Sequence, residues 1–194
     1  MMHGGIMDTN EEKGILLGFL SLFETPNKDG KLGAILITDH NGVPQEFRCS
    51  HPVKPTAIQK PLYGNTLEPY VGIQLCGIPL IQSIKLKPNL IIVDKEFLLK
   101  VRNESPFPVI FLHRAGETME VESSDGSENT KQRLESSTGT FQPVIIMAHS
   151  DYREDQDSAR EIIEDIFSHL DPYEPFERMQ KAIEVLGKQD NRFQ

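Results

Sequence analysis

Acidic residues at the ends of apolar segments are the side chains of this sequence best suited to chemistry. The run NLIIV (89–93) leads directly into Asp94, and the apolar segment that begins at residue 14 ends at Glu24. A third acid, Glu68, stands immediately before Pro69. A carboxylate delivered by a strand can act as a general acid or base. Each acid also has a structural alternative: Asp94 as a strand end, Glu68 as an acid at a helix start, and Glu24 as the flank of a turn.

Other catalytic and binding motifs are absent from the sequence. There is no GxxxxGK[ST] or GxGxxG nucleotide-binding loop, no GxSxG elbow and no HExxH pair. Cys49 and His51 lie close in sequence but lack the further CxxC pairs of a zinc site. We therefore predict that Cys49 and Cys76 are buried thiols rather than a disulfide or a ligand pair.

Three apolar segments near the N-terminus predict an antiparallel meander. Residues 14–25 and 31–38 are apolar on both alternating faces, as in strands that are covered on both sides. Turn residues separate them, and Asn41-Gly42 closes the second hairpin. Residues 43–50 alternate between apolar and polar and include Pro44, which predicts an edge strand.

The rest of the chain alternates between strand and helix patterns. Residues 62–84 carry apolar residues at helical spacing, but two prolines and two glycines interrupt them, which predicts two short helices or one kinked helix. The apolar pattern predicts further strands at 89–94, 108–114 and 141–150, and a short helix at 96–103.

We predict one α/β domain over 14–150, with a mixed sheet that helices cover. It is preceded by a flexible N-terminus (1–13) and contains a flexible polar loop at 117–140. Residues 151–194 show two apolar stripes at helical spacing and predict an amphipathic helical pair packed on the same domain. Asp171 and Pro172 have the residue types of a helix start.

Charge is unevenly distributed along the chain. The formal net charge is −9, which disfavours binding to nucleic acid or to a membrane surface by bulk electrostatics. Residues 151–194 hold 12 acids and 6 bases, a net of −6, whereas residues 44–102 hold 8 bases and 4 acids, a net of +4. The N-terminus has no basic region followed by an apolar one, so we expect a cytoplasmic protein.

Two segments resemble the endonuclease V and UvrC branch of the ribonuclease H-like fold. GAILITDHNGVPQEFR (33–48) is similar to the second and third strands of that branch, and KPNLIIVD (87–94) to its fourth strand. The resemblance implies carboxylates that bind Mg²⁺ and activate water for phosphodiester cleavage. It implies that Asp94 is the fourth-strand ligand, that Glu68 is the helix carboxylate and that Glu24 replaces the first-strand acid.

The sequence departs from that branch at two positions. The branch has an aspartate in the middle of its first strand, whereas Glu24 comes at the end of the segment. A glycine-rich turn follows the fourth-strand aspartate in the branch, whereas Lys95 follows Asp94 here.

Three functions are compatible with this sequence. The absence of a complete site, the acidic helical pair and the polar loop favour a non-catalytic interaction subunit of a larger assembly, with a protein partner and no cofactor. The alternative is a Mg²⁺-dependent ribonuclease H-like nuclease, or an inactive descendant of one, that acts on nucleic acid. The third is a small-molecule enzyme with its site at the carboxyl ends of the strands.

Overall fold

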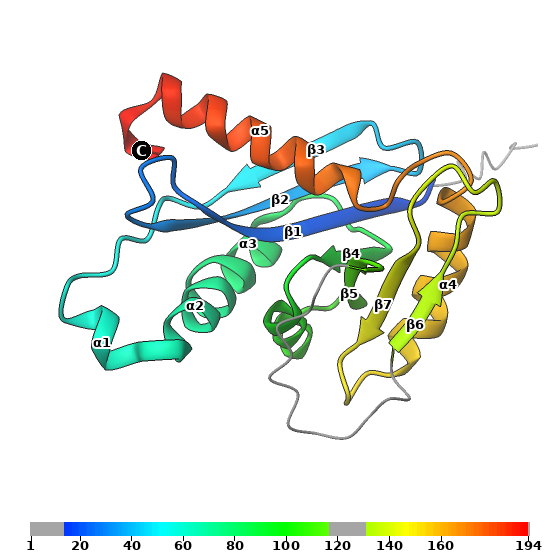
Figure 1. Cartoon of the computed structure of the whole chain (residues 1–194), viewed down its shortest axis with the longest axis horizontal. Coiled ribbons are helices and arrows are strands. Elements are labelled where there is room, and N and C mark those ends of the chain that lie inside the picture. Colours follow the sequence, from blue (N-terminus) through cyan, green and yellow to red (C-terminus); the bar gives the residue numbers. More distant parts are fainter. Residues whose placement is uncertain (1–13, 117–130, 194) are drawn as a thin grey trace, which may run out of the picture.

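A seven-stranded mixed sheet forms the centre of the computed structural model, which describes residues 14–116 and 131–193 (Figure 1). In spatial order its strands are β3 (Pro44–Cys49), β2 (Lys31–Asp39), β1 (Leu16–Glu24), β4 (Leu90–Val93), β5 (Val109–Arg114), β7 (Val144–Ala148) and β6 (Lys131–Leu134). The β1–β4 and β4–β5 pairs are parallel, and the other pairs are antiparallel. The predicted α/β class, the mixed sheet and the N-terminal meander are confirmed.

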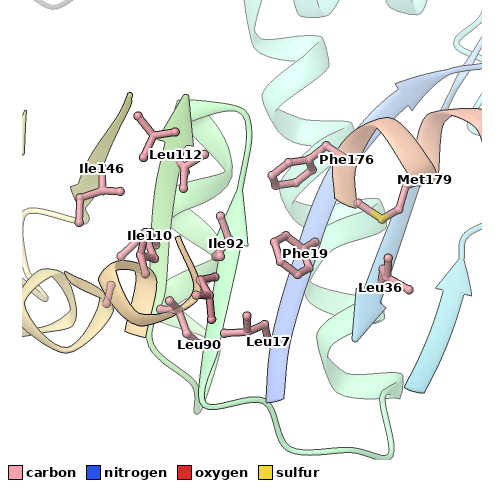
Figure 2. Close-up of a cluster of buried hydrophobic side chains, with 14 of the residues drawn as sticks. Leu17, Phe19, Leu36, Leu90, Ile92, Ile110, Leu112, Ile146, Phe176 and Met179 are labelled. Carbon is pink, nitrogen blue, oxygen red and sulfur yellow. The ribbon is translucent and has the colours of Figure 1, made fainter. Parts of the chain in front are cut away.

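Side-chain alternation along the central strands creates one apolar core on each face of the sheet. Helices α4 (Glu154–Ile166) and α5 (Glu174–Gln189) cover one face, where Phe19 packs edge-on against Phe176, and Leu90 and Ile92 belong to the same core (Figure 2). The other face is covered by a π-helix η2 (Val71–Gly77), helix α3 (Ile78–Ser83) and a 3₁₀ segment η3 (Glu96–Asn103). Because both faces are covered, the central strands are mostly apolar on both faces.

The helical segment before β4 consists of α1 (Gln59–Tyr63), η1 (Gly64–Thr66), α2 (Leu67–Tyr70), η2 and α3. The backbone stays helical through the junctions of α2, η2 and α3, so the prolines and glycines do not divide this part into the two short helices that the sequence allowed. The π-helical turn was not predicted. A Cβ on Gly72 would lie 2.7 Å from Phe97, and one on Gly77 would lie 2.8 Å from the Gly72 carbonyl oxygen. The two glycines therefore permit close packing of η2, and they are not simply helix breakers.

Two sequence predictions are corrected in the C-terminal half. The predicted loop at 117–140 contains strand β6, which pairs with β7 at the edge of the sheet although Leu134 is its one buried residue. This strand is defined by its backbone pairing with β7, and its side-chain pattern does not reveal it. Residues 117–130 of the predicted loop and the predicted flexible N-terminus 1–13 lie outside the described residues. Helix α5 begins at Glu174, after the predicted start, and the Asp171 carboxylate accepts a hydrogen bond from the Tyr173 amide.

A buried ion pair attaches α4 to the sheet. Asp155 is 3% exposed and accepts two hydrogen bonds from the Arg102 guanidinium, at 2.6 and 3.2 Å. It also accepts one from the backbone amide of Val109, at the start of β5. Arg102 in turn stacks on the ring of Tyr152, with 4.1 Å from Cζ to the centroid. Among the described residues no helix is long and apolar enough to cross a membrane.

We predict that Asp155→Ala destabilises the fold by about 3–5 kcal/mol, because it leaves the Arg102 charge without its partner in a mostly buried position. Urea unfolding measures this change. Asp157→Ala is the matched control, because Asp157 is an exposed acid in the first turn of the same helix. An equal loss of stability in both variants would contradict a special role for the Asp155–Arg102 pair.

Candidate functional site

The parallel pairing of β1 with β4 places Ser21 beside Asp94. Leu20 pairs with Val93, so the next residue on each strand is Ser21 and Asp94, at the carboxyl end of β4. Alternation puts Ser21 on the same face as Phe19 and Asp94 on the same face as Ile92, which is the face that α4 and α5 cover. Carboxyl ends of parallel strands are the usual position of functional sites in α/β sheets.

Ser21 is buried, and Asp94 is half-buried with its Oδ1 shielded from solvent. Ser21 is 2% exposed, and neither its Oγ nor Asp94 Oδ1 has a hydrogen-bond partner. Burial raises the pKa of the Asp94 carboxyl, against the opposing effects of the Lys95 charge and of the nearby Ser21 hydroxyl. The hydroxyl thus approaches the carboxyl without hydrogen-bond geometry. Sequence analysis missed Ser21, although it is the one polar residue in the run ILLGFLSLF (15–23).

The other two predicted site acids lie around a lysine. Lys31 Nζ is 3.0 Å from Glu68 Oε1 and 3.6 Å from Glu24 Oε1. Glu24 follows Ser21 by three residues along β1, which corresponds to roughly 10 Å. The structure therefore brings Glu24 and Glu68 together around Lys31, and it places Asp94 beside Ser21.

A cavity of about 490 Å³ opens between the β1–β2 turn and the α1–α2 segment. Glu24, Glu68 and Lys31 line it together with two further lysines, Lys28 and Lys60. The cavity lies at the same edge of the sheet as the Ser21–Asp94 pair, because β1 ends there.

These residues do not fit a magnesium centre that several carboxylates share. The neighbour of Asp94 on β1 is a hydroxyl, and Glu24 and Glu68 share the Lys31 ammonium as their ion-pair partner, away from Asp94. In the part of the chain that the structure describes, no three His, Cys, Asp or Glu side chains form a group that could hold a metal ion. The catalytic and metal-binding roles of Asp94, Glu68 and Glu24 therefore stay predictions.

The fold is the ribonuclease H-like fold of the endonuclease V nucleases. The chain superposes on human endonuclease V with a TM-score of 0.61 and 11% sequence identity, over 92% of this chain and 86% of that one. It superposes on the endonuclease V of Bacillus subtilis with a TM-score of 0.59 and 10% identity, over 90% of this chain and 82% of that one. No family model and no curated protein sequence matches the chain.

These likenesses confirm the expected fold and correct the expected function. The prediction of a non-catalytic interaction subunit is wrong, because the fold is shared with nucleases and the comparisons give no support for a protein partner.

We predict that Ser21→Asp creates a metal site. Two adjacent buried carboxylates repel each other, and a divalent cation relieves that repulsion, so Mn²⁺ raises the melting temperature of this variant. For the wild type we expect no change of the melting temperature with Mn²⁺. Thermal unfolding with and without Mn²⁺ measures both. In Ser21→Asp/Asp94→Asn the response disappears, and a response that persists in this double variant would contradict the assignment of the site.

We predict that Asp94→Asn stabilises the protein at neutral pH. Because the folded-state pKa of Asp94 is raised, its contribution to stability is complete below the ordinary aspartate pKa and is lost as the pH rises through the folded value. The amide cannot ionise, so the variant has the higher melting temperature at pH 7.5, and the difference shrinks towards pH 4.5. Asp39→Asn, in an exposed turn, serves as the control. A difference that does not depend on pH would refute this account.

Proposed function

We propose that this protein binds single-stranded nucleic acid at the carboxyl edge of β1 and β4, and that it is a ribonuclease H-like protein without the shared metal centre of a nuclease. The observation that carries the proposal is the nuclease fold, matched over 90% of the chain, with Ser21 where the strand beside Asp94 would have to supply a second carboxylate. A cytoplasmic location is part of the same proposal.

The charge distribution favours this edge despite the acidic total. Three lysines there make no ion pair with described residues: Lys28 in the turn after β1, Lys60 in α1, and Lys95 directly after Asp94. The acidic helices α4 and α5 cover the opposite face of the sheet from η2 and η3. A local basic surface is enough for phosphate contacts, because screening limits the reach of distant charges to about 10 Å at 0.1 M salt.

Exposed aromatic rings supply a second element of such a surface. Tyr63 and Tyr70 lie with their ring centroids 5.3 Å apart and remain 38% and 42% exposed. They belong to the α1–α2 segment, which extends from the body of the molecule (Figure 1). Unpaired bases stack on exposed aromatic rings whatever their sequence, so this pair suits a single strand.

A second candidate function is Mg²⁺-dependent cleavage of nucleic acid. The buried and unpartnered Asp94 Oδ1 at the carboxyl end of β4 favours it. Mg²⁺ is commonly held by one or two carboxylates together with substrate phosphates, so Asp94 is the residue that would hold it.

Binding and cleavage assays with single-stranded DNA and RNA oligonucleotides separate these functions. We expect salt-dependent binding by fluorescence anisotropy, and no cleavage with Mg²⁺ or Mn²⁺. Cleavage that Asp94→Asn abolishes would establish the nuclease and overturn the first proposal. Absence of both binding and cleavage would remove both candidates.

We predict that Tyr63→Ala/Tyr70→Ala weakens single-strand binding by about 1–3 kcal/mol for each base that loses its stacking partner. Anisotropy titration at fixed salt gives the change. Val185→Ala is the control, because Val185 is 50% exposed on the acidic helix α5. If the control weakens binding as much as the tyrosine variant does, the tyrosines are not the stacking surface.

A further inference from the structure

The cavity between the β1–β2 turn and the α1–α2 segment is lined by three lysines and three acids, and two of the lysines have no described acidic partner. Each of its three acids has a cation within 4 Å: Lys31 lies next to Glu24 and Glu68, and Lys54 lies 2.9 Å from Asp29. The Lys54 hydrogen bond is also the main cause that lowers the pKa of Asp29, so this acid is ionised and paired. Two more lysines, Lys28 and Lys60, line the cavity without a described acidic partner.

The groups that remain available in this cavity are therefore hydrogen-bond donors. Lys28 and Lys60 carry unpaired ammonium groups, and the Asn65 side chain has no hydrogen-bond partner among the described residues. Ammonium groups without carboxylate partners select an anion, and they disfavour a metal ion.

The turn that carries Lys28 is held in place by hydrogen bonds. The Thr25 carbonyl accepts from the Lys28 amide at 2.8 Å, and the Thr25 hydroxyl, which is buried, donates to Asp29 and accepts from the Gly30 amide. Lys28 itself has a positive φ of 57°. The lysine is thus presented from a defined backbone position, and Lys60 comes from a separate element, α1.

We propose that this cavity binds a phosphate group of the nucleic-acid backbone through Lys28 and Lys60. The inference rests on the proposed function and adds to it the position of the backbone. Lys60 precedes Tyr63 by three residues in α1, and Glu24 follows Ser21 by three residues in β1. A phosphate in the cavity therefore lies near the α1–α2 segment that carries the exposed tyrosines, at the same edge of the sheet as the Ser21–Asp94 pair.

The test compares two double variants that each remove two positive charges. Lys28→Asn/Lys60→Ala removes the cavity lysines, with asparagine chosen because it tolerates a positive φ. Lys85→Asn/Lys87→Ala is the matched control, because these exposed lysines precede β4 at its opposite, amino end. Lys28→Arg/Lys60→Arg keeps both charges and retains binding. Amide NMR spectra check that each variant is folded.

For the cavity variant we expect the salt slope of single-strand binding to fall by about 1.4, or 0.7 for each lost phosphate contact. That corresponds to an affinity roughly 25-fold lower at 0.1 M salt, relative to 1 M. The control variant stays within about threefold of the wild type on the same titration. Equal losses in both double variants would overturn the cavity proposal and leave the proposed function standing.

Titration with inorganic phosphate separates the two ideas. If the wild type binds no oligonucleotide but phosphate shifts the amides of Gly30 and Asn65, and does not shift them in the cavity variant, the proposed function fails and the anion site stands as a free-phosphate site. If neither phosphate nor oligonucleotide has an effect, both are overturned.

Discussion

The parallel pairing of β1 with β4 is the interaction on which the rest of this structure depends. It joins segments about 70 residues apart, and the paired residues from Leu17 to Leu20 and from Leu90 to Val93 are almost completely inaccessible to solvent, apart from Gly18, which has no side chain. Burial of each large apolar side chain contributes roughly 1.5–3 kcal/mol. Because both faces of these strands are covered, a shift of one residue in register would exchange the two cores. The same register fixes which polar residues meet at the carboxyl edge.

Much of the fold can be predicted from local sequence, whereas the arrangement of residues around Asp94 cannot. Continuous apolar runs bounded by turn residues identify β1, β2, β4 and β5, since each strand carries its own signal. The partner of Asp94 depends on the register between two distant strands, and no local pattern specifies it. Attention to the acids therefore selected Glu24, at the strand end, and overlooked Ser21, which lies beside Asp94. Strand β6 was missed for a related reason. It has one buried side chain, and its backbone pairing with β7, which no local pattern specifies, defines it as a strand.

The total charge is a poor guide to what this molecule binds. Several acids of the C-terminal helices are committed to structure: Asp155 holds Arg102, while Asp171 and Glu177 both hold Arg114 at 3.0 Å. These pairs fasten the helices to the ends of the sheet and do not present free charge. The lysines at the opposite side lack such partners. A net of −9 thus combines a few structural acids with exposed acids of the C-terminal helices, and the unpaired lysines lie across the sheet from them.

The Ser21–Asp94 pair at the carboxyl end of β4 lowers the stability of the fold, and this loss of stability needs an explanation. Each buried polar atom without a partner costs roughly 1–3 kcal/mol. Apolar residues at these two positions would continue the cores that already surround them, as Phe19 and Ile92 do on the same face. Local rules of packing are broken chiefly where function demands it. Ser21 also cannot restore what a second carboxylate would provide, because a hydroxyl carries no charge with which to hold a cation. The pair is therefore a structural cost that packing does not explain, and its chemistry does not suit a metal centre that several carboxylates share.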